Sequence, residues 1–303
     1  MTPASHPVAL VGVTASGKSA LALAFARARP EFEIVSVDSM QVYRGMDIGT
    51  AKPTPEERAL VPHHLIDIAD PWDDYTVARY QRDAREVLDD IARRGRRALF
   101  VGGTGLYLRA VVDALTIPGQ YPSAREEIEA EPDTAVLHRR LSELDPVAAS
   151  RMEPTNRRRI VRALEVTVGS GRRFSAHGPG LTEYPSAPFT LVGIDVDAAV
   201  IAERIADRYR QQLAAGFLDE VRALAQLPLG LSRTARQALG YKELLAHLDG
   251  AFGVDEAIDL AVRRTRRFAR RQRVWFARDP RIQWLDGSTE PNLLLGALDA
   301  VVG

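Results

Sequence analysis

The fold is decided by the stretch Gly12-Val13-Thr14-Ala15-Ser16-Gly17-Lys18-Ser19, which matches the pattern G-x-x-x-x-G-K-S/T in full. An apolar run over 8–13 leads into this stretch, and Ala and Leu recur at helical density over 19–29. A strand, a glycine-rich turn and a helix in this order form a P-loop, whose backbone N–H groups face an anion. We therefore expect these eight residues to bind phosphate, with a point charge from Lys18 and a hydroxyl from Ser19 that can hold Mg²⁺.

Strands and helices alternate after this motif. The Val- and Ile-rich run over 33–38 predicts a second strand, and the apolar run over 98–101 predicts a third. Between them, apolar residues recur at helical spacing over 76–94, and another helix begins at Thr104. This alternation predicts an α/β domain of the P-loop NTPase type, in which helices flank a parallel sheet and ligands bind at the carboxyl ends of the strands.

The alternation stops near residue 114. Helical stretches without a convincing strand follow, between joints rich in Pro and Gly at 117–122 and 178–188. The strand pattern returns over 190–196, and the remaining chain is mostly helical, with a long helix over 254–278 and a short strand at 283–285. We therefore expect 1–113 and 190–303 to form the catalytic domain, and 114–189 to be an inserted, all-helical domain.

The composition excludes several classes of protein. The 303 residues include no Cys, which rules out disulfides, thiolate catalysis and Cys-ligated zinc in this chain. No apolar run approaches the roughly 20 residues of a membrane-spanning helix, and residues 1–7 lack the pattern of a secretory signal. We expect a cytoplasmic monomer with no membrane partner.

The residues near the P-loop do not favour ordinary nucleotide hydrolysis. Enzymes of that kind place an Asp at the end of a neighbouring strand to hold the metal, whereas the strand over 98–101 runs into Gly-Gly-Thr. The available carboxylate is Asp38, which is either a cap or loop carboxylate, or a base beside the phosphate. Thr104 either caps the following helix or donates its hydroxyl to a bridging phosphate oxygen.

Arginine gathers in two predicted helices. The C-terminal helix has no acidic residue among its arginines, and Phe268, Trp275 and Phe276 are interleaved with Arg263, Arg264, Arg266, Arg267, Arg270, Arg271, Arg273 and Arg278. A second cluster in the expected insertion comprises Arg157, Arg158, Arg159 and Arg162, with Arg172 and Arg173 at the far end of the helix. Two such helices suit a long phosphate backbone. The alternative is a solvated helix face that is paired with acidic neighbours, since the 40 basic and 40 acidic residues balance.

Six blocks occur in order along nearly the whole chain. They are 12–19, Asp38-Ser39-Met40-Gln41, GMDIGTAKP at 45–53, GGTGLY at 102–107, RALEV at 162–166 and QALGYK at 237–242. The only three Lys residues of the chain, Lys18, Lys52 and Lys242, each fall inside one of these blocks. In these blocks the chain resembles bacterial tRNA dimethylallyltransferases, also called tRNA isopentenyltransferases.

The resemblance implies transfer of a dimethylallyl group from dimethylallyl diphosphate to N6 of the adenosine at tRNA position 37, next to the anticodon. The products would be N6-dimethylallyladenosine and diphosphate. Asp38 would take the proton of the amine, Thr104 would contact the bridging oxygen or the target nucleotide, and Lys18 with Mg²⁺ at Ser19 would stabilise the leaving diphosphate. The adenine must first leave the stack of the anticodon stem-loop.

The same resemblance assigns contacts with tRNA to residues in three regions: Asp38, Ser39, Met40, Gln41 and Thr104; Arg125, Arg158, Arg159 and Arg162; and Gln237, Gly240, Tyr241 and Lys242. The chain departs from the family in two ways: some relatives have Arg in place of Gln237, and eukaryotic relatives carry a C-terminal zinc finger. Arg204 and Arg208 either reach the diphosphate or form surface salt bridges.

Three other functions remain open from the sequence. One is a P-loop kinase for a small molecule, with Asp38 as the base and ATP as the donor. Another is an isopentenyltransferase that acts on free adenine nucleotides, and the third is an RNA-binding module whose P-loop only senses nucleotide. The length and the two arginine-rich helices disfavour the first two, and the carboxylate at the strand end disfavours the third.

Overall fold

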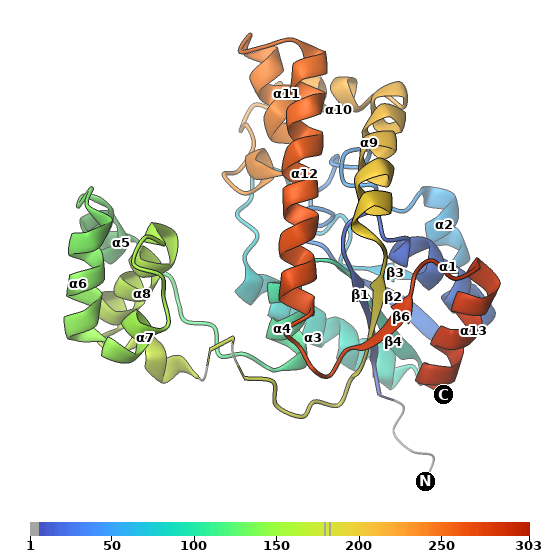
Figure 1. Cartoon of the computed structure of the whole chain (residues 1–303), viewed down its shortest axis with the longest axis horizontal. Coiled ribbons are helices and arrows are strands. Elements are labelled where there is room, and N and C mark those ends of the chain that lie inside the picture. Colours follow the sequence, from blue (N-terminus) through green and yellow to red (C-terminus); the bar gives the residue numbers. More distant parts are fainter. Residues whose placement is uncertain (1–5, 179, 182) are drawn as a thin grey trace. The chain divides into compact units, whose positions relative to one another are not determined.

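The computed structural model describes residues 6–178, 180–181 and 183–303, so most of the N-terminal segment 1–7 lies outside the described residues. In this described part, six parallel strands form one sheet in the order β3-β2-β4-β1-β5-β6 (Figure 1). The strands are β1 (Val8–Gly12), β2 (Phe32–Val37), β3 (His63–His64), β4 (Arg97–Gly102), β5 (Thr190–Asp195) and β6 (Gln283–Asp286). All residues of β1 and β2 are buried, as expected where helices cover both faces of a parallel sheet.

Helices pack on both faces of the sheet. On one face, α1 (Lys18–Ala28) packs beside α13 (Pro291–Val302). On the other face lie α3 (Val77–Arg93), α4 (Gly105–Val112) and α12 (Val254–Phe276), because right-handed crossovers in opposite directions along a sheet use opposite faces (Figure 1). The remaining helices of this part are α2 (Pro55–Leu60), α9 (Ala198–Ala214), α10 (Phe217–Ala225), η2 (Ala235–Gln237) and α11 (Tyr241–Leu248).

The chain divides into two compact units. One consists of Met1–Val112 and Ser186–Gly303, and the other of Asp113–Pro185. The observed second unit ends four residues before the expected boundary at 189. Ala187 and Phe189 pack against the core of the first unit, where the rings of Phe189 and Phe100 lie 5.7 Å apart.

The second unit is a small helical bundle. Its described elements are α5 (Pro122–Glu129), α6 (Thr134–Leu144), α7 (Pro146–Ser150), α8 (Arg157–Ser170) and η1 (Phe174–His177). They enclose a core of their own, which includes Ile128, Leu137, Leu141, Ile160 and Leu164. A separate apolar core is what allows an inserted segment to fold as a unit.

The fold class expected from the sequence is confirmed, but β3 was not predicted. Two adjacent histidines carry no alternating apolar pattern, and the strand exists because their backbone pairs with Ile34 and Val35 of β2. Among the described residues, no helix combines the length and the apolar character that crossing a bilayer requires.

Candidate active site

The turn between β1 and α1 is shaped to face an anion. Ala15 has a φ of 64° and Gly17 a φ of 89°, and no side chain caps the start of α1. The positive φ explains the glycine at 17, whereas Ala15 adopts this conformation at a cost of roughly 1 kcal/mol. Ser16 Oγ is buried and has no hydrogen-bond partner among the described residues. A buried hydroxyl without a partner, next to uncapped helix amides, is a site that a bound anion completes.

Two cations lie at this turn. Lys18 is half-buried, and its ammonium donates a hydrogen bond to the carbonyl oxygen of Val13 at 3.2 Å. Burial lowers the pKa of Lys18 to about 8, although the nearby Asp38 carboxylate raises this pKa and Arg208 lowers it further. Arg208 Nε is buried without a partner in the described part of the chain, whereas Arg204 is exposed. The structure therefore brings Arg208 to the P-loop.

Asp38 and Thr104 meet at the carboxyl edge of the sheet. Asp38 Oδ1 accepts hydrogen bonds from the backbone N–H groups of Met40 at 2.8 Å and Gln41 at 3.3 Å. Thr104 Oγ1 accepts from the N–H of Ser39 at 3.2 Å, so the hydroxyl connects the loop after β4 to the loop after β2. Because the Thr104 oxygen is the acceptor in this bond, the hydrogen of the Thr104 hydroxyl can still be donated to a ligand.

The glycine-rich block after β4 permits unusually close packing. A Cβ atom on Gly102 would lie 2.1 Å from the carbonyl oxygen of Val37, and one on Gly103 would lie 2.2 Å from Gln272 Nε2. One on Gly105 would lie 2.0 Å from Trp275 Nε1. None of these glycines has a positive φ, so close approach and not backbone conformation explains them. The sequence alone did not show that Gln272 lies beside the P-loop. The glycine block indicated close packing there, but not which residue packs against it.

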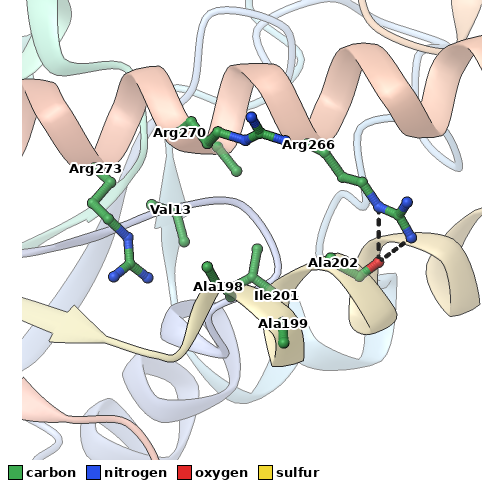
Figure 2. A pocket seen from close by; sticks show the side chains of 9 residues that line it. Val13, Ala198, Ala199, Ile201, Ala202, Arg266, Arg270 and Arg273 are labelled. Atoms are coloured by element: carbon green, nitrogen blue, oxygen red, sulfur yellow. Dashed lines mark hydrogen bonds between the residues drawn. The ribbon is translucent and has the colours of Figure 1, made fainter.

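A cavity of about 310 Å³ lies between α9 and α12, beside Val13 of the P-loop. Figure 2 shows its α12 side, which Arg266, Arg270 and Arg273 line, with Arg266 reaching Ala202 of α9. Alanines and Ile201 form much of the remaining lining. The cavity therefore suits a ligand that is part hydrocarbon and part anion.

A buried lysine holds the loop that follows the Asp38 block. The Lys52 side chain is 2% exposed, and its ammonium donates to the carbonyl oxygen of Tyr43 at 2.6 Å and to carboxylate oxygens of Asp47 and Asp67, each at 2.5 Å. These bonds use all three donors of the ammonium. Lys52 is therefore a structural residue that supports the loop, and it is not available to a substrate.

Comparisons with known proteins show the family to which the chain belongs. The family model described as IPP transferase matches residues 41–279. The chain belongs to the IPP transferase family. The tRNA dimethylallyltransferase of Salinispora tropica is 50% identical to it, over 93% of this chain and 88% of the relative. The resemblance inferred from the sequence blocks is confirmed.

Solved structures of IPP transferases have the same fold. The full-length tRNA isopentenylpyrophosphate transferase of Bacillus halodurans has a TM-score of 0.71 and 36% identity, and the match covers 98% of this chain and 97% of that one. A eukaryotic dimethylallyltransferase acting on tRNA has a TM-score of 0.76 and 26% identity, over 93% of this chain and 73% of that one.

The arginines of α12 differ in whether they have a hydrogen-bond or ion-pair partner. Arg264 pairs with the buried Glu243, Arg273 lies 3.1 Å from Asp195, and Arg266 donates to a backbone carbonyl of α9. Arg278 lies beyond the last residue of the helix. The alternative of a helix face paired with acidic neighbours therefore applies to part of these arginines. In the described part of the chain, the exposed arginines of α12 without a hydrogen bond or ion pair are Arg263, Arg267, Arg270 and Arg271, of which Arg271 lies over the ring of Phe268.

The segment 237–242 is exposed at its two ends and mostly buried between them. Gln237 and Lys242 are exposed, and Lys242 Nζ donates to Gln237 Oε1 at 3.1 Å. Gly240 is buried, and Tyr241 is completely buried with its hydroxyl donating to Glu220 at 2.5 Å. Gln237 and Lys242 can thus face a ligand, whereas the Tyr241 ring lies in the core.

The second unit uses two of its candidate arginines internally. Glu165 is 1% exposed, and its carboxylate accepts hydrogen bonds from Arg125 at 3.4 Å and from Arg162 at 2.8 Å. Arg158 and Arg159 are exposed at the start of α8. Of the four arginines that the sequence assigns to tRNA, these two are therefore the ones whose charge is presented to solvent.

Proposed function

We propose that this chain transfers the dimethylallyl group of dimethylallyl diphosphate to N6 of the adenosine at tRNA position 37, and releases diphosphate. The observation that carries the proposal is the meeting of the P-loop, Asp38 and Thr104 at one sheet edge, where β4 ends in glycine and not in a carboxylate. A phosphoryl-transfer enzyme needs a carboxylate there to hold its metal. Prenyl transfer needs a cradle for a leaving diphosphate and a base for an amine, and these residues supply both.

The leaving group determines what the P-loop does. When the bond between the allylic carbon and the diphosphate oxygen breaks, the electron pair stays on that oxygen and negative charge grows on the diphosphate. Lys18, Arg208 and the uncapped amides of α1 stabilise this charge. The apolar lining beside Val13 offers the hydrocarbon part of the donor an approach to the same loop.

The amine determines what Asp38 does. As the bond between N6 and the allylic carbon forms, one proton leaves N6 and passes to the Asp38 carboxylate. Two backbone amides hold Oδ1 of this carboxylate, which orients the side chain while Oδ2 takes part in neither bond. The Thr104 hydroxyl, held by Ser39, donates its hydrogen to the bridging oxygen of the diphosphate or to the target nucleotide.

Mg²⁺ is part of the proposal. Among the described residues there is no group of three or more His, Asp or Glu side chains that could hold a metal ion. Mg²⁺ characteristically keeps several waters and binds through one or two protein ligands plus phosphate oxygens, so an exposed hydroxyl such as Ser19 fits it. The ion would supply further positive charge to the diphosphate oxygens.

The proposed tRNA contacts combine exposed residues with the half-buried loop at 38–41. On the first unit we assign contact with the RNA to the loop Asp38-Ser39-Met40-Gln41, to Gln237 and Lys242, and to the unpaired arginines of α12. On the second unit we assign it to Arg158 and Arg159. Unpaired guanidinium groups on a helix surface are suited to phosphates of an RNA backbone. The enzyme would act as a monomer in the cytoplasm, where its RNA substrate is found.

A transfer assay tests this function. Purified protein is incubated with dimethylallyl diphosphate, Mg²⁺ and unmodified tRNA, and the nucleosides are separated by mass. We expect N6-dimethylallyladenosine and one diphosphate released per modified nucleoside. If the protein instead consumes ATP with a small acceptor and leaves the RNA unchanged, the kinase alternative is correct. Modification of free AMP but not of tRNA would establish the alternative of a free-nucleotide transferase.

A further inference from the structure

Gln272 of α12 connects two loops of the catalytic edge. Its Oε1 atom accepts a hydrogen bond from the backbone N–H of Thr14 in the P-loop at 2.9 Å. Its Nε2 atom donates to the carbonyl oxygen of Gly103, the residue before Thr104, also at 2.9 Å. One amide group therefore bridges the diphosphate loop and the threonine loop, from a helix more than 150 residues away in the sequence.

The surroundings of Gln272 fix its side chain. The residue is 7% exposed, and a Cβ atom on Gly103 would lie 2.2 Å from Nε2, so only glycine leaves room for the amide at this place. The next turn of α12 packs equally closely, because a Cβ atom on Gly105 would lie 2.0 Å from Trp275 Nε1. Buried backbone groups must be paired, so the amide satisfies an N–H and a carbonyl that would otherwise be left without partners.

We propose that Gln272 is a positioning residue for the transfer reaction. It holds the P-loop and the loop of Thr104 at a fixed separation, so that the leaving diphosphate and the Thr104 hydroxyl keep their relative placement. This inference rests on the proposed function. Gln272 does not itself reach the reacting atoms, and it acts through the backbone of Thr14 and Gly103.

The bridge has a specific consequence for kinetics. Without the bridge, the P-loop can present its amides to the diphosphate in several arrangements. Misplacement of these amides lowers the turnover rate more than it lowers the stability of the fold. In our proposal, most of the RNA contacts come from exposed side chains that do not take part in this bridge. Loss of the bridge should therefore affect binding of diphosphate and turnover, and leave the affinity for tRNA nearly unchanged.

Gln272→Met tests the bridge, because Met has a similar volume and makes neither hydrogen bond. The matched control is Thr265→Val on the same helix, which removes the buried bond of 2.9 Å between Thr265 and Tyr209 without touching the P-loop. For each protein we would measure kcat, the KM for dimethylallyl diphosphate, the melting temperature, and the Kd for inorganic diphosphate and for tRNA.

We expect Gln272→Met to weaken binding of inorganic diphosphate and to lower kcat, each roughly tenfold, as the loss of one to two buried hydrogen bonds predicts. The Kd for tRNA should stay within about twofold, and Thr265→Val should lower the melting temperature without changing the other values. A second variant, Gly103→Ala, displaces the amide by its Cβ. Because it breaks the same bridge, combining it with Gln272→Met should add little further loss.

Two results would overturn the inference. If Gln272→Met lowers the melting temperature as Thr265→Val does but binds diphosphate and turns over like the wild type, the residue only stabilises the fold. Equal losses for tRNA and for diphosphate would likewise exclude a local positioning role. Wild-type protein that neither binds inorganic diphosphate nor modifies tRNA would overturn the proposed function as well, so failure of the two ideas can be told apart.

Discussion

Binding of the donor should weaken as the pH rises through about 8. Burial lowers the pKa of Lys18 to about 8 in the free protein, from a usual value of 10.5, while Asp38 and Arg208 act on it in opposite directions. The ammonium that stabilises a diphosphate is therefore present below this pH and is lost above it. A bound diphosphate raises the pKa again, so binding above pH 8 must include uptake of a proton.

The size of the effect follows from the protonated fraction. With a pKa of about 8, roughly 90% of Lys18 is charged at pH 7 and roughly 10% at pH 9. The apparent Kd is the intrinsic Kd divided by the competent fraction, so it should rise roughly tenfold between these two values of pH. Calorimetric titration with dimethylallyl diphosphate and Mg²⁺ at several pH values between 7 and 9 measures this dependence.

Lys18→Arg is the control, because a guanidinium stays charged throughout this range. The pH profile of Lys18→Arg also contains any change in binding that comes from ionisation of dimethylallyl diphosphate itself. We expect weaker binding by Lys18→Arg at pH 7, since a fork of donors replaces a compact ammonium, but a much flatter pH profile than that of the wild type. A flat wild-type profile, or an equally steep one for Lys18→Arg, would refute the assignment of this titration to Lys18.

Three further predictions concern the base, the RNA surface and the second unit. Asp38→Asn should lower kcat by at least about a hundredfold, as expected for loss of a general base, with the Kd for tRNA within a few fold; equal losses in a filter-binding assay would make Asp38 a binding residue. Replacing Arg263, Arg267 and Arg270 by Ala should weaken tRNA binding and reduce the slope of log K against log salt by about two. The same triple change at Arg82, Arg85 and Arg93 of α3 is the control, and identical salt slopes for both variants would exclude the α12 surface. Glu165→Ala leaves Arg125 and Arg162 without their buried partner, so the second unit should lose about 3 kcal/mol in urea unfolding; an unchanged midpoint would contradict the role of that carboxylate.

Local patterns predicted the catalytic half of the fold well. The P-loop, the buried strands and the start of α12 depend on residues that are close in sequence, where apolar spacing and glycine placement carry the information. The sequence also placed Asp38 and Thr104 at the ends of neighbouring strands, and parallel strands end at the same edge of a sheet. The prediction that these side chains lie near the P-loop follows from that geometry alone.

Long-range pairing could not be predicted in this way. Gln272 and Glu220 are polar residues in helices, and nothing near them in sequence shows that one reaches the P-loop or that the other accepts hydrogen bonds from the loop at Ile48. The partners of Arg264 and Arg125 are missing from the sequence pattern for the same reason. A cluster of arginines indicates a basic helix, but which charges remain unpaired depends on carboxylates brought together only by folding.

The most direct test of the account is a crystal structure of the protein with Mg²⁺ and a thio analogue of dimethylallyl diphosphate that reacts slowly. We predict that the diphosphate lies on the amides at the start of α1, with Lys18 and Arg208 beside it and the allylic carbon directed toward Asp38. An empty P-loop in that crystal would contradict the account, if a nucleoside triphosphate occupies the loop in a parallel experiment with its terminal phosphate directed at an acceptor.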